Sequence, residues 1–574
     1  MKTKCVRSLI PAAFVLLSLA LPSVVTAADE IMEYKVDRSV KVQTAPDEAQ
    51  ERWKDDRFGL FIHWGPISQM GKQLSHSRNS PSHRPGGGPY KVAPIEPEVY
   101  DVQYKTFNPT AYDPDAIVKL AQRAGMRYLV FTAKHHDGFS MFDSAVTDYD
   151  IMKTPYGKDL LKELEQACRR NHFNFGIYFS PRDWHHPDCD SENHHDRYIA
   201  FYKAQMEEML TRYGSIYEIF FDGLGPGNWG NTAAEVVQRI RALQPNAMVN
   251  DRGGVVGDFY TPEHTISYFN RQQLWQTCHT TTGQWGYNPD VRAKRLPLLM
   301  ELLLYTWGAD GNMLLNIGPR GDGSLNPEEV ERLEQLAAWW AVHGETSIRG
   351  SRGGPYLPGP WGVATCKDRR VFLHIFRWPA QGSLSLPALP GRIPQAAQLL
   401  AGGELTFTRT KGGFDIRVDP KHREPIVTTV EVTFDGDVRK VAPLPVQQSL
   451  TWNARLTASH APDDLRNIVD RDAATYWHAK LRKGEEAFWI EATFDAPKTI
   501  GSVVLGRGDE WTPRQNPALQ VPDGKGGWKT AFTWKPKWAP VVFLDPPTIT
   551  DKVRLRVTGA TTYHLAEFEL YPLQ

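Results

Sequence analysis

A carboxylate at the end of a mostly apolar run is the residue in this sequence best placed to do chemistry. The run begins at Tyr217 and ends at Asp222, and Gly and Pro residues follow it. A strand holds its last side chain rigidly, and glycines leave open space in front of it. Asp222 is therefore a candidate reactive carboxylate, with an ordinary loop-capping Asp as the alternative interpretation.

Polar side chains follow other apolar runs in the same way. His63 and Trp64 end one run, and His135 and His136 follow another. Each residue alone has a structural interpretation, because polar residues after strands often cap the next helix. When several successive strands end in such residues, however, the side chains meet at one rim of the sheet. The pattern therefore predicts a functional site that includes Asp222. Further members of this pattern are Tyr178, Arg182, Trp184, Asn250, Asp251 and Arg252.

Several kinds of catalytic site are disfavoured. Neighbouring residues on an extended strand point to opposite faces, so the pair His135-His136 is a poor chelator, and no H-E-x-x-H motif occurs. No G-x-S-x-G elbow and no phosphate-binding loop is present, and no G-x-G-x-x-G follows the first strand. The sequence predicts no metal and no cofactor. Paired carboxylates of the kind that cleave glycosides are the chemistry that is left.

Alternating strand-like and helix-like segments must position these residues. This alternation predicts an α/β fold in which a (β/α)8-like TIM barrel occupies residues 28–346. The expected strands are 58–63, 127–132, 175–180, 217–222, 247–250 and 313–316. The expected helices are 114–124, 158–170, 196–212, 232–243, 291–305 and one that begins at Asn326. A Ser-, Pro- and Gly-rich insert at 69–97 is expected to be a loop over the barrel mouth.

The remaining segments predict two β domains and a leader. Short alternating runs predict a β-sandwich at 347–445 and a second β-sandwich domain at 446–574. Residues 1–27 read as a signal peptide, so we expect a secreted or periplasmic protein. Lys plus Arg and Asp plus Glu both number 66, which gives no electrostatic case for nucleic acid. No later segment is long and apolar enough to predict membrane insertion.

Six motifs stand in order along the chain: RFGLFIHWG at 57–65, AKHHDGF at 133–139, VNDR at 249–252, TPE at 261–263, WGY at 285–287 and NMLLNIGP at 312–319. Together they resemble the motifs of glycoside hydrolase family 29, the α-L-fucosidases. The resemblance spans about residues 30–445. It implies a retaining hydrolase that removes fucose from a fucosylated oligosaccharide or glycoconjugate, with Asp222 as the nucleophile. The residues implied to contact the sugar are His63, Trp64, His135, His136, Tyr178, Arg252 and Trp285.

Two positions compete for the acid/base role that the family requires. One is the Glu of a Thr-Pro-Glu stretch, here Glu263. The other is the Glu of a Trp-Glu-x-Cys stretch, which is Gln276 in this chain and cannot exchange a proton. We therefore predict Glu263. A second departure from the family pattern is that Gln73 and His76 stand where a Glu-Trp-like pair is common.

The last domain carries the stretches TAS at 457–459, NIVDRDAATYW at 467–477, FWIE at 488–491 and AEFELY at 566–571. With these stretches, residues 446–574 resemble a discoidin-like module of the kind that binds carbohydrate. Trp511 and Trp528 are the residues we expect to bind glycan, and a module that only packs against the barrel is the alternative. The Thr-Pro-Glu placement and this module favour α-1,3/1,4-linked, Lewis-type substrates. Because of Gln276 and the altered Gln73/His76 region, a catalytically weak or inactive glycan-binding protein on a glycosidase scaffold remains the alternative function.

Overall fold

The computed structural model describes residues 36–79, 93–224, 229–472, 475–507, 516–534, 541–559 and 562–573. The predicted signal peptide at 1–27 lies outside these residues, as do positions 80–92 of the predicted loop at 69–97. Across the described ranges, no helix combines the length and the apolar character needed to cross a membrane.

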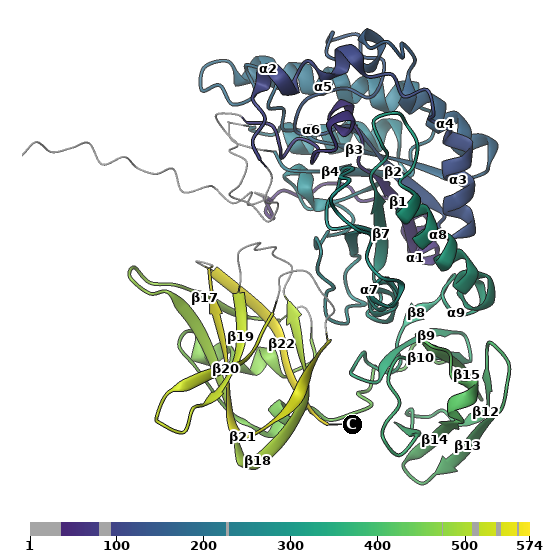
Figure 1. Cartoon of the computed structure of the whole chain (residues 1–574), viewed down its shortest axis with the longest axis vertical. Coiled ribbons are helices and arrows are strands. Elements are labelled where there is room, and N and C mark those ends of the chain that lie inside the picture. Colours follow the sequence, from purple (N-terminus) through teal and green to yellow (C-terminus); the bar gives the residue numbers. More distant parts are fainter. Residues whose placement is uncertain are drawn as a thin grey trace, which may run out of the picture. The chain divides into compact units, whose positions relative to one another are not determined.

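A curled parallel sheet forms the centre of the first domain (Figure 1). Its strand order is β5-β4-β3-β2-β1-β7-β6, and every residue in six of these strands is buried. Burial on both faces explains the nearly continuous apolar runs in the sequence. The strands are β1 Phe58–Ile62, β2 Tyr128–Lys134, β3 Asn174–Phe179, β4 Glu218–Phe221, β5 Met248–Val249, β6 Gln276–Thr280 and β7 Asn312–Ile317.

The described residues give seven strands rather than the eight expected, and an irregular segment lies between the two edges of the sheet. Phe259 bridges to Asn250, just after β5, whereas Tyr260 and Glu263 bridge to Trp275 and Cys278 at β6. The segment 259–263 therefore runs from one edge strand to the other. Strand β6 was not predicted, because its sequence, QTCHT, is polar.

Helices follow the strands along the chain and cover the outside of the sheet (Figure 1). Their apolar faces join the outer faces of the strands in one large core cluster. The main helices are α3 Pro114–Arg123, α4 Leu160–Arg170, α5 His195–Arg212, α6 Thr232–Leu243, α7 Leu296–Gly308 and α8 Pro327–Trp339, close to their predicted positions. The other helices are α1 Asp47–Asp56, α2 Pro97–Tyr100 and α9 Glu345–Ser347.

Two antiparallel sheets follow the last helix. One has the order β12-β15-β10-β9-β8 and the other β11-β14-β13, and side chains from both sheets share one hydrophobic core. This is the arrangement expected of a β-sandwich. The strands are β8 Arg352–Gly353, β9 Gly362–Lys367, β10 Arg370–Ile375, β11 Ser383–Pro387, β12 Pro394–Leu399, β13 Leu405–Thr410, β14 Gly413–Val418 and β15 Thr428–Phe434.

The C-terminal domain is a further antiparallel β-sheet structure with its own core. Its strand order is β17-β22-β18-β21-β19-β20, with β16 paired to β18. Trp528 begins β20, and the Arg554 guanidinium lies 4.1 Å from the centre of its ring. Trp511 lies outside the described residues. The strands are β16 Arg455–Ala458, β17 Trp477–Lys480, β18 Ala487–Arg507, β19 Asn516–Pro522, β20 Trp528–Thr533, β21 Val541–Thr558 and β22 Thr562–Pro572.

Candidate active site

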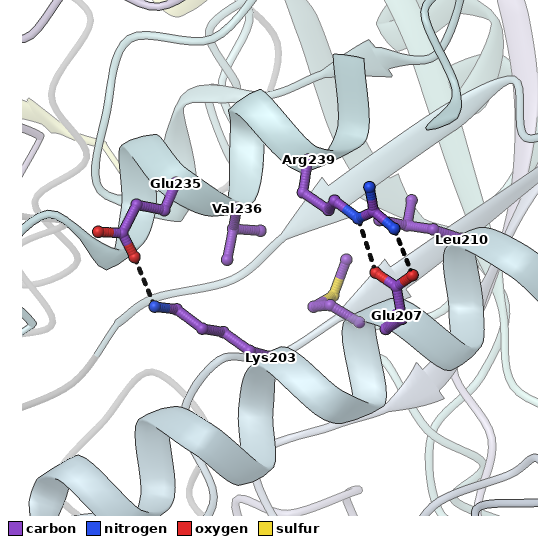
Figure 2. Close-up of a pocket in the computed structure, with 7 residues that line it drawn as sticks. Lys203, Glu207, Leu210, Glu235, Val236 and Arg239 are labelled. Carbon is purple, nitrogen blue, oxygen red and sulfur yellow. Dashed lines mark hydrogen bonds and ion pairs between the residues drawn. The ribbon is translucent and has the colours of Figure 1, made fainter. Parts of the chain in front are cut away.

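A surface groove between α5 and α6 is not the site that the sequence predicts (Figure 2). Its volume is about 280 Å³. Ion pairs link the two helices, Lys203 to Glu235 and Arg239 to Glu207. Apolar side chains of Met206, Leu210 and Val236 also line it. These contacts hold two outer helices together, and none of them involves a predicted site residue.

The predicted residues instead gather around Asp222, directly after β4. The Tyr178 hydroxyl donates a hydrogen bond of 2.6 Å to Asp222 Oδ2, and His136 Nε2 lies 3.4 Å from the same oxygen. Arg252 Nη1 donates to the other oxygen, Oδ1, over 3.2 Å. Side chains that follow β2, lie on β3 and follow β5 thus converge on the one carboxylate. Three contacts from separate elements fix its orientation.

These contacts decide the charge of Asp222. Burial by itself would raise the pKa of this carboxyl. The hydrogen bond and charge of His136 and the charge of Arg252 outweigh burial, so the pKa is held well below its usual value. Asp222 is therefore ionised at neutral pH, as a carboxylate nucleophile must be.

Glu263 lies beside Asp222, and Arg252 connects the two. Arg252 Nη1 donates to Glu263 Oε2 over 3.0 Å, and the same nitrogen lies 3.2 Å from Asp222 Oδ1. These two oxygens are therefore no more than 6.2 Å apart, which is the sum of the two distances. Thr261 fixes the guanidinium, since its hydroxyl and carbonyl oxygens accept from Arg252 Nε and Nη2 at 2.7 and 2.8 Å. The separation is compatible with the roughly 5–5.5 Å between the carboxyl groups of retaining glycosidases.

The competing position, Gln276, lies elsewhere. Its side-chain amide donates to the Tyr128 hydroxyl over 2.7 Å and to Glu218 Oε2 over 3.1 Å. Glu218 begins β4, and Asp222 follows the end of that strand. At ~3.3 Å per residue the two positions are about 13 Å apart along the strand. Gln276 thus faces the opposite end of the sheet from Asp222, and this placement favours Glu263 for the second carboxyl.

Aromatic and imidazole rings line the space next to Asp222. The His135 ring stacks on Tyr178, with ring centres 5.1 Å apart and planes 6° apart. The His63 ring lies 5.4 Å from His135 and 4.8 Å from Trp285. Asn316 orients this group, because His63 Nδ1 lies 2.7 Å from its Oδ1 and its amide donates to the Trp285 carbonyl. The rings form a continuous wall that offers apolar faces and polar edges.

The two histidines in this wall are neutral. Burial lowers the pKa of His63 to about 3 and, helped by the neighbouring histidines, lowers the pKa of His135 well below its usual value. A neutral imidazole has one donor nitrogen and one acceptor nitrogen. Such rings suit the recognition of sugar hydroxyl groups, which both donate and accept.

Trp64 does not join this group, although it was predicted to contact the sugar. Its ring packs on Phe107 and Tyr112, and its indole nitrogen donates to the Arg320 carbonyl. The residue is 1 % exposed and belongs to the core cluster between sheet and helices. His63 and Trp64 are neighbours whose side chains point to opposite sides of the sheet, which explains why only His63 reaches the site.

The two positions that depart from the family pattern differ in placement. The His76 ring lies against His135, His136 and Trp184, with ring centres 5.7–6.0 Å away. Gln73 is buried, and its Oε1 accepts from the Gly286 amide over 3.3 Å. His76 therefore belongs to the site, whereas Gln73 supports the loop that carries Trp285. Sequence reasoning did not single out Asn316, which orients His63, although it lies within the NMLLNIGP motif.

Comparisons with known proteins identify the family to which the chain belongs. The family model described as alpha-L-fucosidase matches residues 25–345. Plasma alpha-L-fucosidase of Rattus norvegicus is 27 % identical over 401 residues, covering 62 % of this chain and 85 % of the relative. The Homo sapiens plasma enzyme is 28 % identical over 372 residues, covering 58 % of this chain and 78 % of the relative.

Solved structures extend the likeness. Alpha-L-fucosidase isoenzyme 1 from Paenibacillus thiaminolyticus aligns with a TM-score of 0.59 and 30 % identity, over 68 % of this chain and 99 % of its own. A GH29 alpha-L-fucosidase from Bacteroides thetaiotaomicron, trapped as a covalent intermediate with 2-fluoro-fucosyl fluoride in a glutamate-to-glutamine mutant, has the same fold at TM-score 0.61 and 24 % identity, over 70 % of this chain and 99 % of its own. The family match covers more than half of the sequence, and the chain belongs to the α-L-fucosidase family of glycoside hydrolases.

Proposed function

We propose that this protein is an exported, retaining exo-α-L-fucosidase in which Asp222 is the nucleophile and Glu263 the acid/base. The observation that carries this proposal is the single Arg252 nitrogen that contacts both carboxylates, at 3.2 and 3.0 Å. Retention needs two carboxyl groups close enough to act on one anomeric carbon. The covalent intermediate trapped in the Bacteroides thetaiotaomicron relative supports the same chemistry.

The reaction takes two displacements. Asp222 attacks the anomeric carbon and forms a bond to it, while Glu263 donates its proton to the glycosidic oxygen and the aglycone leaves. Glu263, now ionised, accepts a proton from water. The water oxygen attacks the same carbon, the bond to Asp222 breaks, and fucose departs with its configuration retained. Tyr178 and Arg252 hold Asp222 in place for both attacks.

The ring wall supplies sugar recognition. His63 and His135 of this wall, with His136 beside them, present donors and acceptors to the hydroxyl groups, and Trp285 offers an apolar face. Fucose carries a methyl group where many hexoses carry a hydroxymethyl group. We propose terminal α-L-fucose on branched, Lewis-type glycans with α-1,3 or α-1,4 linkages as the preferred substrate.

The C-terminal sheet domain is proposed to be a discoidin-like module that binds glycan. Of the two tryptophans expected to bind glycan, Trp528 lies within the described residues. Its ring is partly exposed, and the cationic groups of Lys552 and Arg554 lie over it. A Trp528→Ala variant would then bind fucosylated glycan more weakly in glycan-array measurements while its rate on a small aryl fucoside stays the same. If the variant and the unaltered protein bind the array equally well, Trp528 does not take part in glycan binding.

Incubation with an aryl α-L-fucoside and with a Lewis-type oligosaccharide tests the proposed activity. We expect fucose release from both by the unaltered protein and by Asp148→Asn, a change at an exposed aspartate. Asp222→Asn should abolish release. Glu263→Ala should lose activity on the oligosaccharide and regain it on the aryl fucoside when azide replaces water as nucleophile. Fucose release from neither substrate would instead indicate a glycan-binding protein without hydrolytic activity.

A further inference from the structure

Three histidine side chains converge beside Asp222 in a way that sugar recognition alone does not require. The ligand nitrogens of His76, His135 and His136 all lie within 4.8 Å of one another. Within the described residues, no other group of three or more potential ligands of this kind meets the same distance limit. The arrangement resembles an open metal site with three imidazole ligands.

The sequence-based argument against chelation by His135 and His136 is wrong for a structural reason. That argument placed both residues on an extended strand, where their rings would diverge. Strand β2 ends at Lys134, and the chain then turns, with the Gly138 amide donating to the His135 carbonyl over 3.0 Å. The two rings consequently lie on one side, with centres 4.3 Å apart.

A serine hydroxyl forms a hydrogen bond to one ring nitrogen of His135, and another does so to one ring nitrogen of His136. His135 Nδ1 lies 2.7 Å from Ser75 Oγ, and His136 Nδ1 lies 2.7 Å from Ser180 Oγ. Such a bond to the second ring nitrogen is typical of histidines that bind metals, because it fixes the tautomer and the ring orientation. Both rings, and with them both Nε2 atoms, are therefore held in a fixed orientation.

The orientation of His136 is the most informative. The Ser180 hydroxyl donates its proton to the Arg182 carbonyl over 2.8 Å, so its oxygen accepts from His136 Nδ1. In a neutral ring, Nε2 then carries a lone pair, and it points towards Asp222 Oδ2 at 3.4 Å. A cation must therefore lie between these two atoms. It is either a proton, which gives the charged, hydrogen-bonded His136 that helps to lower the pKa of Asp222, or a metal ion in its place.

We propose that His76, His135 and His136 bind a divalent ion of the zinc class beside Asp222, and that the bound ion inhibits the enzyme. Imidazole and carboxylate suit Zn²⁺, and ligands at ~2.0–2.1 Å in a tetrahedron lie about 3.4 Å apart. The ligand nitrogens lie within 4.8 Å of one another, and a small movement of the half-buried His76 side chain would bring them to this spacing. An ion there attracts the Asp222 carboxylate and excludes the sugar from the space beside it.

Calorimetric titration of chelator-treated, full-length protein with Zn²⁺ tests this inference without any substrate. We expect one ion per chain for the unaltered protein and for His172→Asn, a control at an exposed histidine whose φ of 51° suits asparagine. His76→Asn should bind at least ten-fold more weakly. Equal binding by His76→Asn, or no binding by the unaltered protein, would overturn the proposal.

A second variant keeps the test decisive should His76→Asn fail to fold. Ser180→Ala removes the hydrogen bond that orients His136, and loss of such a partner typically weakens metal binding about 10–100-fold. L-Fucose should compete with Zn²⁺ for the unaltered protein. Binding that is unchanged in Ser180→Ala and insensitive to fucose would place the ion elsewhere. Because these readouts need no turnover, they stand whether or not the proposed hydrolytic activity is found.

Discussion

Replacement of Arg252 by Met removes the one positive charge that contacts both proposed catalytic carboxylates. Methionine is unbranched and uncharged, so the change leaves a similar stem without the guanidinium. The two lost contacts, at 3.2 and 3.0 Å, are charge-assisted hydrogen bonds. At roughly 1.5–3 kcal/mol each they contribute about 3–6 kcal/mol. We therefore expect kcat/KM to fall by about 10²- to 10⁴-fold.

The pH dependence separates this role from a general loss of structure. Asp222 must be ionised to attack. Burial favours its protonated form, and Arg252 is one of the charges that overcome burial and hold its pKa well below the usual value. Without Arg252 the pKa of Asp222 rises, so the acidic limb of the kcat/KM profile should move to higher pH.

Initial rates on an aryl α-L-fucoside, measured across the pH range in which each variant stays folded, give both quantities. Arg252→Lys keeps the positive charge but loses the guanidinium hydrogen bonds to Thr261. We therefore expect its acidic limb to stay near that of the unaltered protein, while its kcat/KM still falls. Arg123→Met, at an exposed arginine, serves as the control. An acidic limb that is unmoved in Arg252→Met, with kcat/KM near that of the unaltered protein, would refute the role assigned to Arg252.

Three further predictions concern residues around and below the site. Tyr178→Phe removes the 2.6 Å hydrogen bond to Asp222 and should lower kcat/KM by about 10–100-fold, whereas an unchanged rate would show that the hydroxyl does not hold the nucleophile. Burial raises the pKa of Glu218 from 4.5 to about 7, so its contribution to stability is present at acidic pH and is lost as the pH rises through about 7. We therefore expect the unfolding free energy of Glu218→Gln, minus that of the unaltered protein, to be ~3 kcal/mol higher in urea titrations at alkaline pH than at acidic pH. A difference that does not change with pH would contradict this. Gln276→Ala breaks the hydrogen bonds to Tyr128 and Glu218 and should lose ~1–3 kcal/mol of stability. The folded fraction should keep its kcat/KM. A large fall in kcat/KM would instead indicate that position 276 takes part in catalysis.

The parallel sheet could be predicted wherever apolar residues dominate its strands. Strands β1, β2 and β7 are buried on both faces, and their sequences are correspondingly apolar. Strand β6 is equally buried but reads QTCHT. Its polar side chains include Gln276, which bonds to Tyr128 and Glu218 inside the sheet. Hydrogen bonds of this kind join residues far apart in the sequence, so local sequence patterns cannot predict them.

Much of the candidate site could be predicted from polar residues at the ends of strands, but the contact between its two carboxylates through Arg252 could not. Asp222 and Tyr178 could be placed on one rim because they lie on successive parallel strands. The Arg252 bridge could not, since Glu263 reaches it through the irregular segment 259–263 between the sheet edges. His76 could not be assigned either, because its position depends on how a loop folds back onto His135 and His136.

Covalent labelling gives the most direct test of the central claim that Asp222 attacks the sugar. The protein would be treated with 2-fluoro-fucosyl fluoride, the reagent with which the Bacteroides thetaiotaomicron relative was trapped, then digested and mapped by mass spectrometry. We predict one fluorofucosyl group per chain, attached to Asp222, and none on the Asp222→Asn variant. A label on a different carboxylate, or hydrolysis of fucosides by a protein that never becomes labelled, would contradict the account.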